Sequence, residues 1–91
     1  MGHAAEERDL LSRYLEPYRR KSFDDLRALI GLIDAREIVG PSGRLYNLEI
    51  ETRWDGRLGG PIRVIGSIDN GSLQNTIVPL CEDFLIAPPD R

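Results

Sequence analysis

The sequence predicts an α+β fold, in which two N-terminal helices pack on one face of a four- to five-stranded antiparallel meander. Two observations lead to this fold class. Apolar residues recur at the spacing of amphipathic helices over the first third of the chain, and from about residue 35 onward they alternate with polar residues, as in strands buried on one face. The length of 91 residues suits one domain, which we expect to span 1–91, with flexible ends at 1–4 and 88–91.

The first helix is predicted over residues 4–20. Its apolar stripe consists of Leu10, Leu11, Tyr14, Leu15 and Tyr18. Pro17 interrupts the pattern, because proline lacks a backbone N–H and its ring crowds the preceding turn. We therefore expect either a kink or an early end near Leu15 or Glu16.

A second helix is predicted to begin after Ser22, which is a favourable N-cap residue with Asp25 at the capping-box position. Its apolar stripe consists of Leu26, Leu29, Ile30 and Ile33. Gly31 weakens the pattern near its end, and we expect the helix to stop near Asp34.

The first strands follow from a change to alternating polarity. A short strand is predicted at 37–39, and Gly-Pro-Ser-Gly at 40–43 is a turn. In the next strand, alternate residues from Tyr46 to Trp54 point to the core and the residues between them face solvent. Two of the solvent-facing residues, Glu49 and Glu51, read as a solvated face and not as a catalytic acid pair.

The remaining strands follow a glycine-rich loop. A strand is predicted over 62–69, where Gly66 indicates a bulge or a close approach by the helix or an aromatic ring. Asn70-Gly71 favours a two-residue hairpin turn. The return strand is predicted over 73–78, with a further short edge strand over 84–87.

The charge balance argues against nucleic acid binding as the main function. Twelve Lys and Arg residues face fifteen Asp and Glu residues, for a net charge of −3, whereas phosphate recognition usually leaves a basic excess. A nucleic-acid accessory protein remains an alternative. It requires one contiguous basic face formed by Arg19, Arg20, Arg53 and Arg63.

Cysteine content and hydropathy predict a cytoplasmic protein. Cys81 is the only cysteine, which excludes a disulfide scaffold within the chain. The charged N-terminal residues do not resemble a signal peptide, and no stretch is apolar over the ~20 residues that a membrane span needs, so no membrane partner is expected.

No group of residues predicts catalysis, a metal site or a cofactor. His3 is the only histidine, and it lies in the N-terminal segment without predicted partners. Cys81 precedes Glu82 and Asp83, whereas a reactive thiolate needs positive surroundings. We read Cys81 as a half-buried apolar residue, and the chain as more consistent with a binding protein than with an enzyme.

The leading interpretation is a non-enzymatic interaction domain that forms a homodimer or binds another protein. Large rings and an open sheet edge favour it, and the candidate interaction residues are Trp54, Arg57, Tyr46 and Phe84. The alternative is a small-molecule binder or minor enzyme, with a pocket between the helices and the sheet where Arg53 or Arg63 holds an anion.

The C-terminal half resembles a group of small uncharacterised bacterial α+β proteins, a domain of unknown function. The resemblance is carried by Trp54-Asp55-Gly56-Arg57-Leu58-Gly59-Gly60-Pro61, by the strand that follows it to Gly71, and by Pro79–Pro88. It implies a bacterial origin and supplies no catalytic residue. It does not extend to the helical half.

Overall fold

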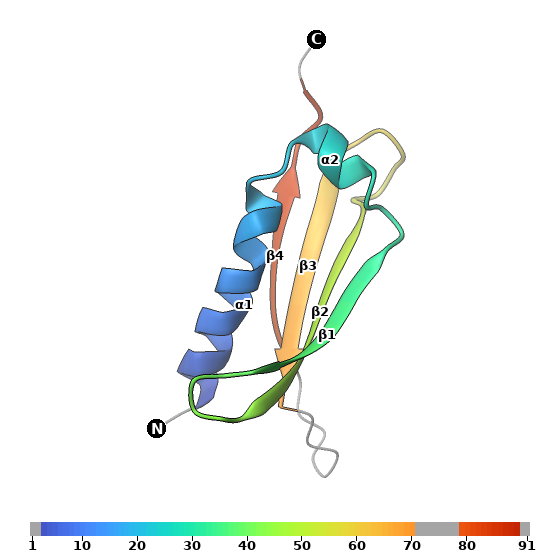
Figure 1. The fold of residues 1–91 in the computed structure, drawn as a ribbon. Coiled ribbons are helices and arrows are strands. Elements are labelled where there is room, and N and C mark those ends of the chain that lie inside the picture. The colour runs from blue at the N-terminus through green and yellow to red at the C-terminus, as the bar shows by residue number, and fades with distance from the viewer. Residues whose placement is uncertain (1–2, 71–78, 90–91) are drawn as a thin grey trace.

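The fold combines two helices with one four-stranded antiparallel sheet, which confirms the predicted α+β class (Figure 1). The structure is a computed structural model that describes residues 3–70 and 79–89. Its elements are α1 (His3–Arg19), α2 (Phe23–Arg27), β1 (Ile33–Val39), β2 (Leu45–Trp54), β3 (Ile62–Asp69) and β4 (Leu80–Ile86). The strand order β1-β2-β3-β4 is a meander, which leaves β1 and β4 as the two edges of this sheet.

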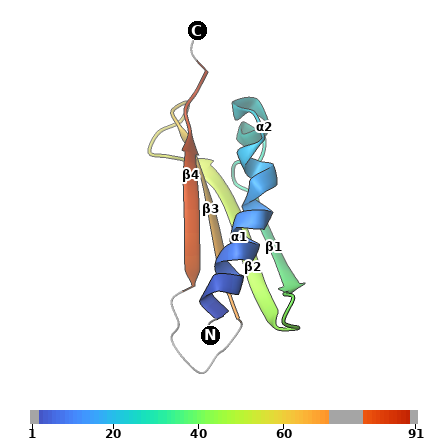
Figure 2. The ribbon, with the colours of Figure 1, turned by 90° about the vertical axis from the view of Figure 1, so that its left-hand side faces the viewer.

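Helix α1 packs over the β3 and β4 half of the sheet and contributes Leu10, Leu11 and Leu15 to the core (Figures 1 and 2). The expected early end at Leu15 or Glu16 is wrong, because the helix continues through Pro17 to Arg19. Contacts to the sheet explain the continuation. The residues that follow Pro17 in the helix bind side chains of β1 and β4, and this offsets the lost backbone hydrogen bond.

Helix α2 is much shorter than predicted. The N-cap prediction is confirmed, since the Ser22 hydroxyl accepts a hydrogen bond from the backbone N–H of Asp25 at 3.1 Å. The predicted end near Asp34 is wrong, because the helix ends at Arg27 and a series of turns follows. Gly31 then adopts a φ of +91°, which breaks the helical path and directs the chain into β1.

Strand β1 is correspondingly longer than the predicted 37–39, because it pairs with β2 along its whole length from Ile33 to Val39. The turn between these strands is where the sequence placed it. The Gly40 N–H donates to the Arg44 carbonyl, the Gly43 N–H donates to the Gly40 carbonyl, and Gly43 has a φ of +86°. This is a three-residue hairpin loop with a glycine bulge.

Strands β2 and β3 alternate between the core and the uncovered face of the sheet, as predicted. Gly66 of β3 is a point of close approach by α1, since an added Cβ would lie 2.9 Å from Leu11 Cδ1 and 3.1 Å from Leu15 Cδ2. The core comprises Leu10, Leu11, Leu15, Leu26, Ile38, Tyr46, Leu48, Ile50, Ile62, Val64 and Ile68.

The last strand confirms part of the C-terminal prediction. β4 includes the predicted edge strand at 84–86 and begins four residues earlier, at Leu80. The predicted return strand at 73–78 and the second residue of the predicted Asn70-Gly71 turn lie outside the described residues.

Candidate functional site

Two of the predicted interaction residues lie at the α2 end of the sheet. Trp54, the last residue of β2, is half-buried, and its ring centroid lies 6.2 Å from that of Phe23. Arg57 is exposed in the loop that follows, where its side chain lies against Gly60. This end of the molecule therefore presents one partly covered aromatic pair beside a loop with one exposed arginine.

Tyr46 lies near the opposite end of β2, about 26 Å along the strand from Trp54 at ~3.3 Å per residue. Its side chain is only 1% exposed, and its hydroxyl donates a hydrogen bond of 2.6 Å to the Glu6 carboxylate of α1. Glu6 also accepts from the backbone N–H and the hydroxyl of Ser42, at 3.0 and 2.8 Å. Tyr46 thus belongs to the contact between α1 and the β1–β2 turn, and it offers no surface ring.

Phe84 lies on the helix-covered side of β4 and is half-buried. The Arg19 guanidinium carbon stands 4.7 Å from its ring centroid, and Arg19 also pairs with Glu82 at 2.6 Å. These contacts hold α1 on the β4 edge, and Phe84 contributes to them by packing against Arg19.

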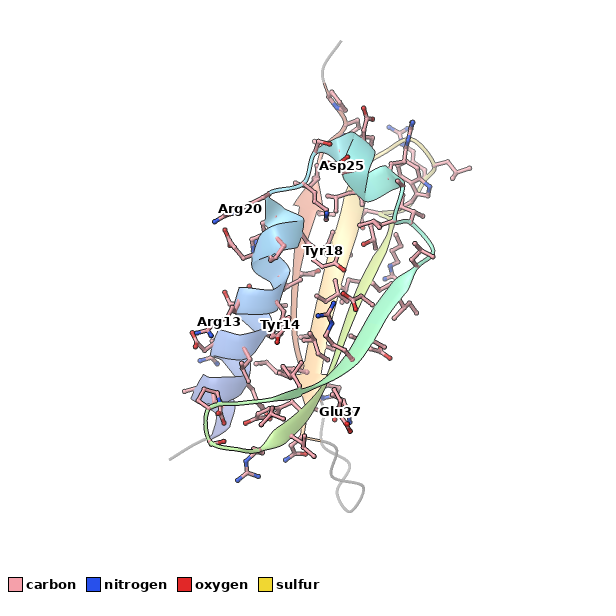
Figure 3. The ribbon with its side chains drawn as sticks, viewed as in Figure 1. Arg13, Tyr14, Tyr18, Arg20, Asp25 and Glu37 are labelled. Carbon is pink, nitrogen blue, oxygen red and sulfur yellow. The ribbon has the colours of Figure 1, made fainter. Side chains whose placement is uncertain are left out.

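Arg53 and Arg63 face each other across β2 and β3, on the side of the sheet that the helices do not cover. Arg63 is paired with Asp55 at 3.0 Å and with Asp83. Neither arginine therefore points toward a pocket between helices and sheet. Arg20 immediately follows α1, and Figure 3 shows it directed away from the sheet, so the predicted basic residues do not form one face.

A cleft between α1 and β1 contains polar residues that the sequence analysis did not select. The Tyr18 hydroxyl donates to Asp34 at 3.0 Å, and Arg36 donates to the same carboxylate at 2.8 Å. The Arg36 guanidinium also lies 5.7 Å from the Tyr14 ring centroid. Figure 3 shows Tyr14 and Tyr18 on the side of α1 that faces the sheet.

The floor of this cleft is a cavity of about 350 Å³. It is lined by Tyr18, Leu29, Leu32, Ile33, Asp34, Ile50 and Thr52. Apolar walls with a hydroxyl and a carboxylate at the rim can accommodate a small amphipathic group. A larger open space of about 670 Å³ lies on α1, lined by Asp9, Ser12, Arg13, Glu16, Pro17 and Arg20. Because α1 and the residue directly after it form all of that lining, this space is the solvent-facing surface of the helix.

Neighbouring groups shift several pKa values at these contacts. The hydrogen bond from Arg36 lowers the pKa of Asp34, against an opposing effect of burial. Burial, followed by the hydrogen bond to Asp34, raises the pKa of Tyr18. Burial together with the nearby Glu6 carboxylate raises the pKa of Tyr46 to about 12. The lowered pKa favours the charged form of Asp34, and the raised pKa values favour the neutral hydroxyls of Tyr18 and Tyr46.

Exposed apolar side chains concentrate along the β1 edge of the sheet. Four of the six large exposed hydrophobic residues in the described part of the chain are Leu32, Ile33, Val39 and Leu45, which are 60%, 57%, 63% and 53% exposed. They lie on β1, immediately before it, or opposite it on β2. The strand contains neither lysine nor proline, and its only charged residues are Asp34, Arg36 and Glu37.

The backbone of β1 offers free hydrogen-bonding groups along the same edge. The bond from the Gly40 N–H to the Arg44 carbonyl makes these two residues a hydrogen-bonded pair, and such pairs alternate along an antiparallel ladder. The register then directs the backbone groups of Asp34, Arg36 and Ile38 toward β2. Those of Ile33, Ala35, Glu37 and Val39 point outward, away from the sheet.

The sequence analysis missed this edge because it assigned Ile33 to the second helix. A weak signal was present, since apolar and charged residues alternate from Ile33 to Arg36, but the stripe from Leu26 to Ile33 fits a helix equally well. Cys81 differs from its prediction too: it is exposed on β4 and not half-buried.

Metal-binding clusters and membrane-spanning helices are both absent from the described residues. No three His, Cys, Asp or Glu side chains gather there as a metal site. None of the helices described is long and apolar enough to cross a bilayer.

Comparison of the chain with family models, with curated proteins and with solved structures finds no match. The resemblance of the C-terminal half to uncharacterised bacterial proteins stays a prediction from its motif. The geometry of the site is therefore the basis for any functional proposal.

Proposed function

We propose that this protein is a non-enzymatic interaction domain that forms a homodimer by pairing the β1 strands of two copies. The observation that carries the proposal is an uncovered edge strand of seven residues with outward backbone groups and exposed apolar side chains at both ends. A second copy supplies an identical strand, and antiparallel pairing of the two is the symmetric solution. The two sheets then join into one continuous sheet.

The other sheet edge, β4, is a poorer surface for self-association. Helix α1 packs against it, with Arg19 bound to Glu82 and stacked on Phe84. Two consecutive acids, Glu82 and Asp83, lie at its centre, where antiparallel self-pairing brings like charges together. The contrast between the two edges supports β1 as the dimer strand.

The test compares proline substitutions on the two edges by sedimentation velocity and light scattering over a concentration series. In Ala35→Pro the lost N–H points outward, so the variant keeps its own sheet and loses a donor to the partner. Leu85→Pro is the matched control on β4, where the same alternation also directs the N–H outward.

We expect the wild type and Leu85→Pro to dimerise at tens of micromolar, as suits an interface about one strand wide, and Ala35→Pro to remain monomeric. Circular dichroism must show that both variants keep the wild-type fold. A wild-type protein that stays monomeric up to about 1 mM, roughly tenfold above the top of that range, would contradict the proposal.

A second candidate function is small-molecule binding in the cleft beside Tyr18. Its support is the cavity of about 350 Å³, which falls in the size range of ligand pockets of roughly 300–1,000 Å³. Titration with small amphipathic amines, followed by NMR, is expected to shift the signals of Leu29 and Thr52 at constant protein concentration. Shifts that depend only on protein concentration and centre on β1 support the dimer instead.

A further inference from the structure

We propose that the homodimer has a single register, in which Ala35 of each copy lies on the two-fold axis. This inference rests on the proposed function and adds the residues that determine how the two strands meet. In an antiparallel pair, directly opposed side chains lie on the same face of the sheet. A two-fold axis between identical strands therefore passes through one residue, which faces its own copy.

The β1 side chains on the helix-covered face of the sheet form the helix-side row, and this row is complementary to itself in the proposed register. From Leu32 to Ile38, alternate residues read apolar, acidic, basic, apolar: Leu32, Asp34, Arg36, Ile38. With Ala35 on the axis, Asp34 faces the partner's Arg36 and Arg36 faces the partner's Asp34. At the ends, the 60% exposed Leu32, which immediately precedes β1, lies opposite the partner's Ile38, a residue already buried in the core of its own chain. Two ion pairs thus lie between two apolar pairs.

The β1 side chains on the uncovered face of the sheet, and the outward backbone groups of β1, are also compatible with a two-fold axis at Ala35. Ala35 is the smallest side chain on the solvent side of β1, so two copies can meet there without a clash. Ile33 faces the partner's Glu37, which lets the aliphatic stem of the glutamate cover it. Ile33, Ala35 and Glu37 are also the residues whose backbone groups point outward, so all three pairs are hydrogen-bonded pairs.

The neighbouring registers place like charges on the axis. An axis at Asp34 opposes two aspartates, one at Arg36 opposes two arginines, and one at Glu37 opposes two glutamates. Each arrangement is destabilising, because directly opposed like charges repel across strands. The order of residues in β1 therefore excludes the registers next to the one proposed.

Within one copy, Asp34 and Arg36 already form an ion pair of 2.8 Å, and Asp34 also accepts from Tyr18. Arg36 donates three hydrogen bonds to the Asp34 carboxylate within one copy, so the partner's Arg36 takes the place of some of these bonds in the dimer. Both charges therefore have a partner in the monomer and in the dimer. Their contribution is to discriminate between registers more than to add affinity.

The test is a charge exchange with mixing. Asp34→Arg gives a chain with two basic residues in the helix-side row, and Arg36→Asp gives a chain with two acidic residues there. Alone, each variant opposes like charges in the proposed register, and we expect at least a tenfold weaker dimer. Mixed in equal amounts, the two variants oppose basic to acidic residues at both positions, and we expect a heterodimer.

The double variant Asp34→Arg/Arg36→Asp is the matched control, since it restores both ion pairs with reversed polarity and is expected to dimerise like the wild type. Recovery on mixing cannot arise from a folding defect, because each chain in the mixture carries the same substitution as it does alone. Sedimentation velocity of the single chains, the mixture and the double variant gives the readout.

In a Cys81→Ser background, disulfide formation tests directly which residue of β1 lies on the two-fold axis. In Ala35→Cys the two Cα atoms should lie about 5.5 Å apart, as in a hydrogen-bonded antiparallel pair, and oxidation should give a covalent dimer. In Glu37→Cys the two cysteines should lie roughly 13 Å apart along the strands, too far for a disulfide.

The outcomes separate the two proposals. A wild-type dimer with recovery on mixing and cross-linking at position 35 only supports both. A wild-type dimer whose variants behave like the wild type, or that cross-links at position 37, overturns the register and leaves the proposed function intact. A monomeric wild type overturns the proposed function, and the register with it.

Discussion

At the level of single residues, Gly66 of β3 is a point of steric constraint between α1 and the sheet. An added Cβ would approach Leu11 and Leu15 to between 2.9 and 3.2 Å, closer than side-chain carbons tolerate. The sequence predicts either a bulge or a close approach by the helix or an aromatic ring at Gly66, and the structure shows the close approach by α1. The helix packs on the sheet at this distance because β3 has no side chain there.

Gly66→Ala is therefore expected to destabilise the protein by about 1 to 3 kcal/mol, as overpacking of a core does. Chemical denaturation measures the effect. The same substitution in a Leu11→Ala background should cost less, because the truncated side chain leaves room for the added methyl group. Ser67→Ala, on the uncovered face, serves as a control and should change stability by no more than about 0.5 kcal/mol. Equal costs in the two backgrounds would contradict the steric explanation.

Tyr46 links stability to alkaline pH. Its pKa is raised from 10.0 to about 12 in the folded protein, so the folded state holds this proton more tightly than the unfolded state. The stability that Tyr46 contributes is complete below pH 10 and is lost as the pH rises through about 12. The raised pKa of Tyr18 acts in the same direction.

Tyr46→Phe should lower stability near neutral pH by about 1 kcal/mol, because Glu6 loses a donor. It should also make stability less dependent on pH above 10. Urea unfolding at a series of pH values, for wild type and variant, gives both quantities. Tyr18→Phe is the comparison that isolates the second tyrosine. An unchanged slope in Tyr46→Phe would show that Tyr46 does not contribute to the alkaline loss.

At the level of elements, the two helices show different limits of sequence-based prediction. The apolar stripe of α1 spans nearly the whole observed helix, whereas the early end near Leu15 or Glu16, expected as the alternative to a kink, is wrong. The stripe from Leu26 to Ile33 was misread, because the same residues satisfy helical spacing and supply a buried α2 residue, a turn and the first residue of β1. Pairing with β2 decided between these structures, and the sequence alone does not reveal that pairing.

Pro17 should make α1 less stable than its sequence otherwise allows. Pro17 is exposed in the last turn and cannot donate to the carbonyl of Arg13 four residues earlier. Pro17→Ala is expected to raise the free energy of unfolding by about 1 to 3 kcal/mol. Ser12→Ala, also exposed on α1, controls for helix propensity and should gain no more than about 0.5 kcal/mol. Equal gains would mean that Pro17 imposes no specific cost.

At the level of the whole molecule, the predicted fold class is confirmed and the candidate site was not predicted. Alternation in β2 and β3 identified which face is buried, because polarity at period 2 directly reports burial. The proposed dimer surface depends on strand order, which makes β1 an edge, and on the hydrogen-bond alternation of the β1–β2 pair. Both are properties of pairing between distant segments. Tyr46, chosen for its ring, is buried and donates a hydrogen bond to Glu6 of α1.

Self-association also predicts a thermal signature. Because the dimer contains only folded chains, the midpoint of thermal unfolding should rise with protein concentration. Differential scanning calorimetry over a hundredfold range of concentration checks this for the wild type. Ala35→Pro should show a midpoint that does not depend on concentration. A wild-type unfolding midpoint that does not depend on protein concentration would count against the dimer.

The contact between α1 and Gly66 has a consequence for biosynthesis. Leu11 and Leu15 are translated before β3 and β4, yet these two strands complete the surface that buries both leucines. Until then, the nascent α1 carries an apolar stripe with nothing native to cover it, a state that attracts chaperones and invites aggregation. The helix that is synthesised first is thus among the last parts of the molecule to reach its final environment.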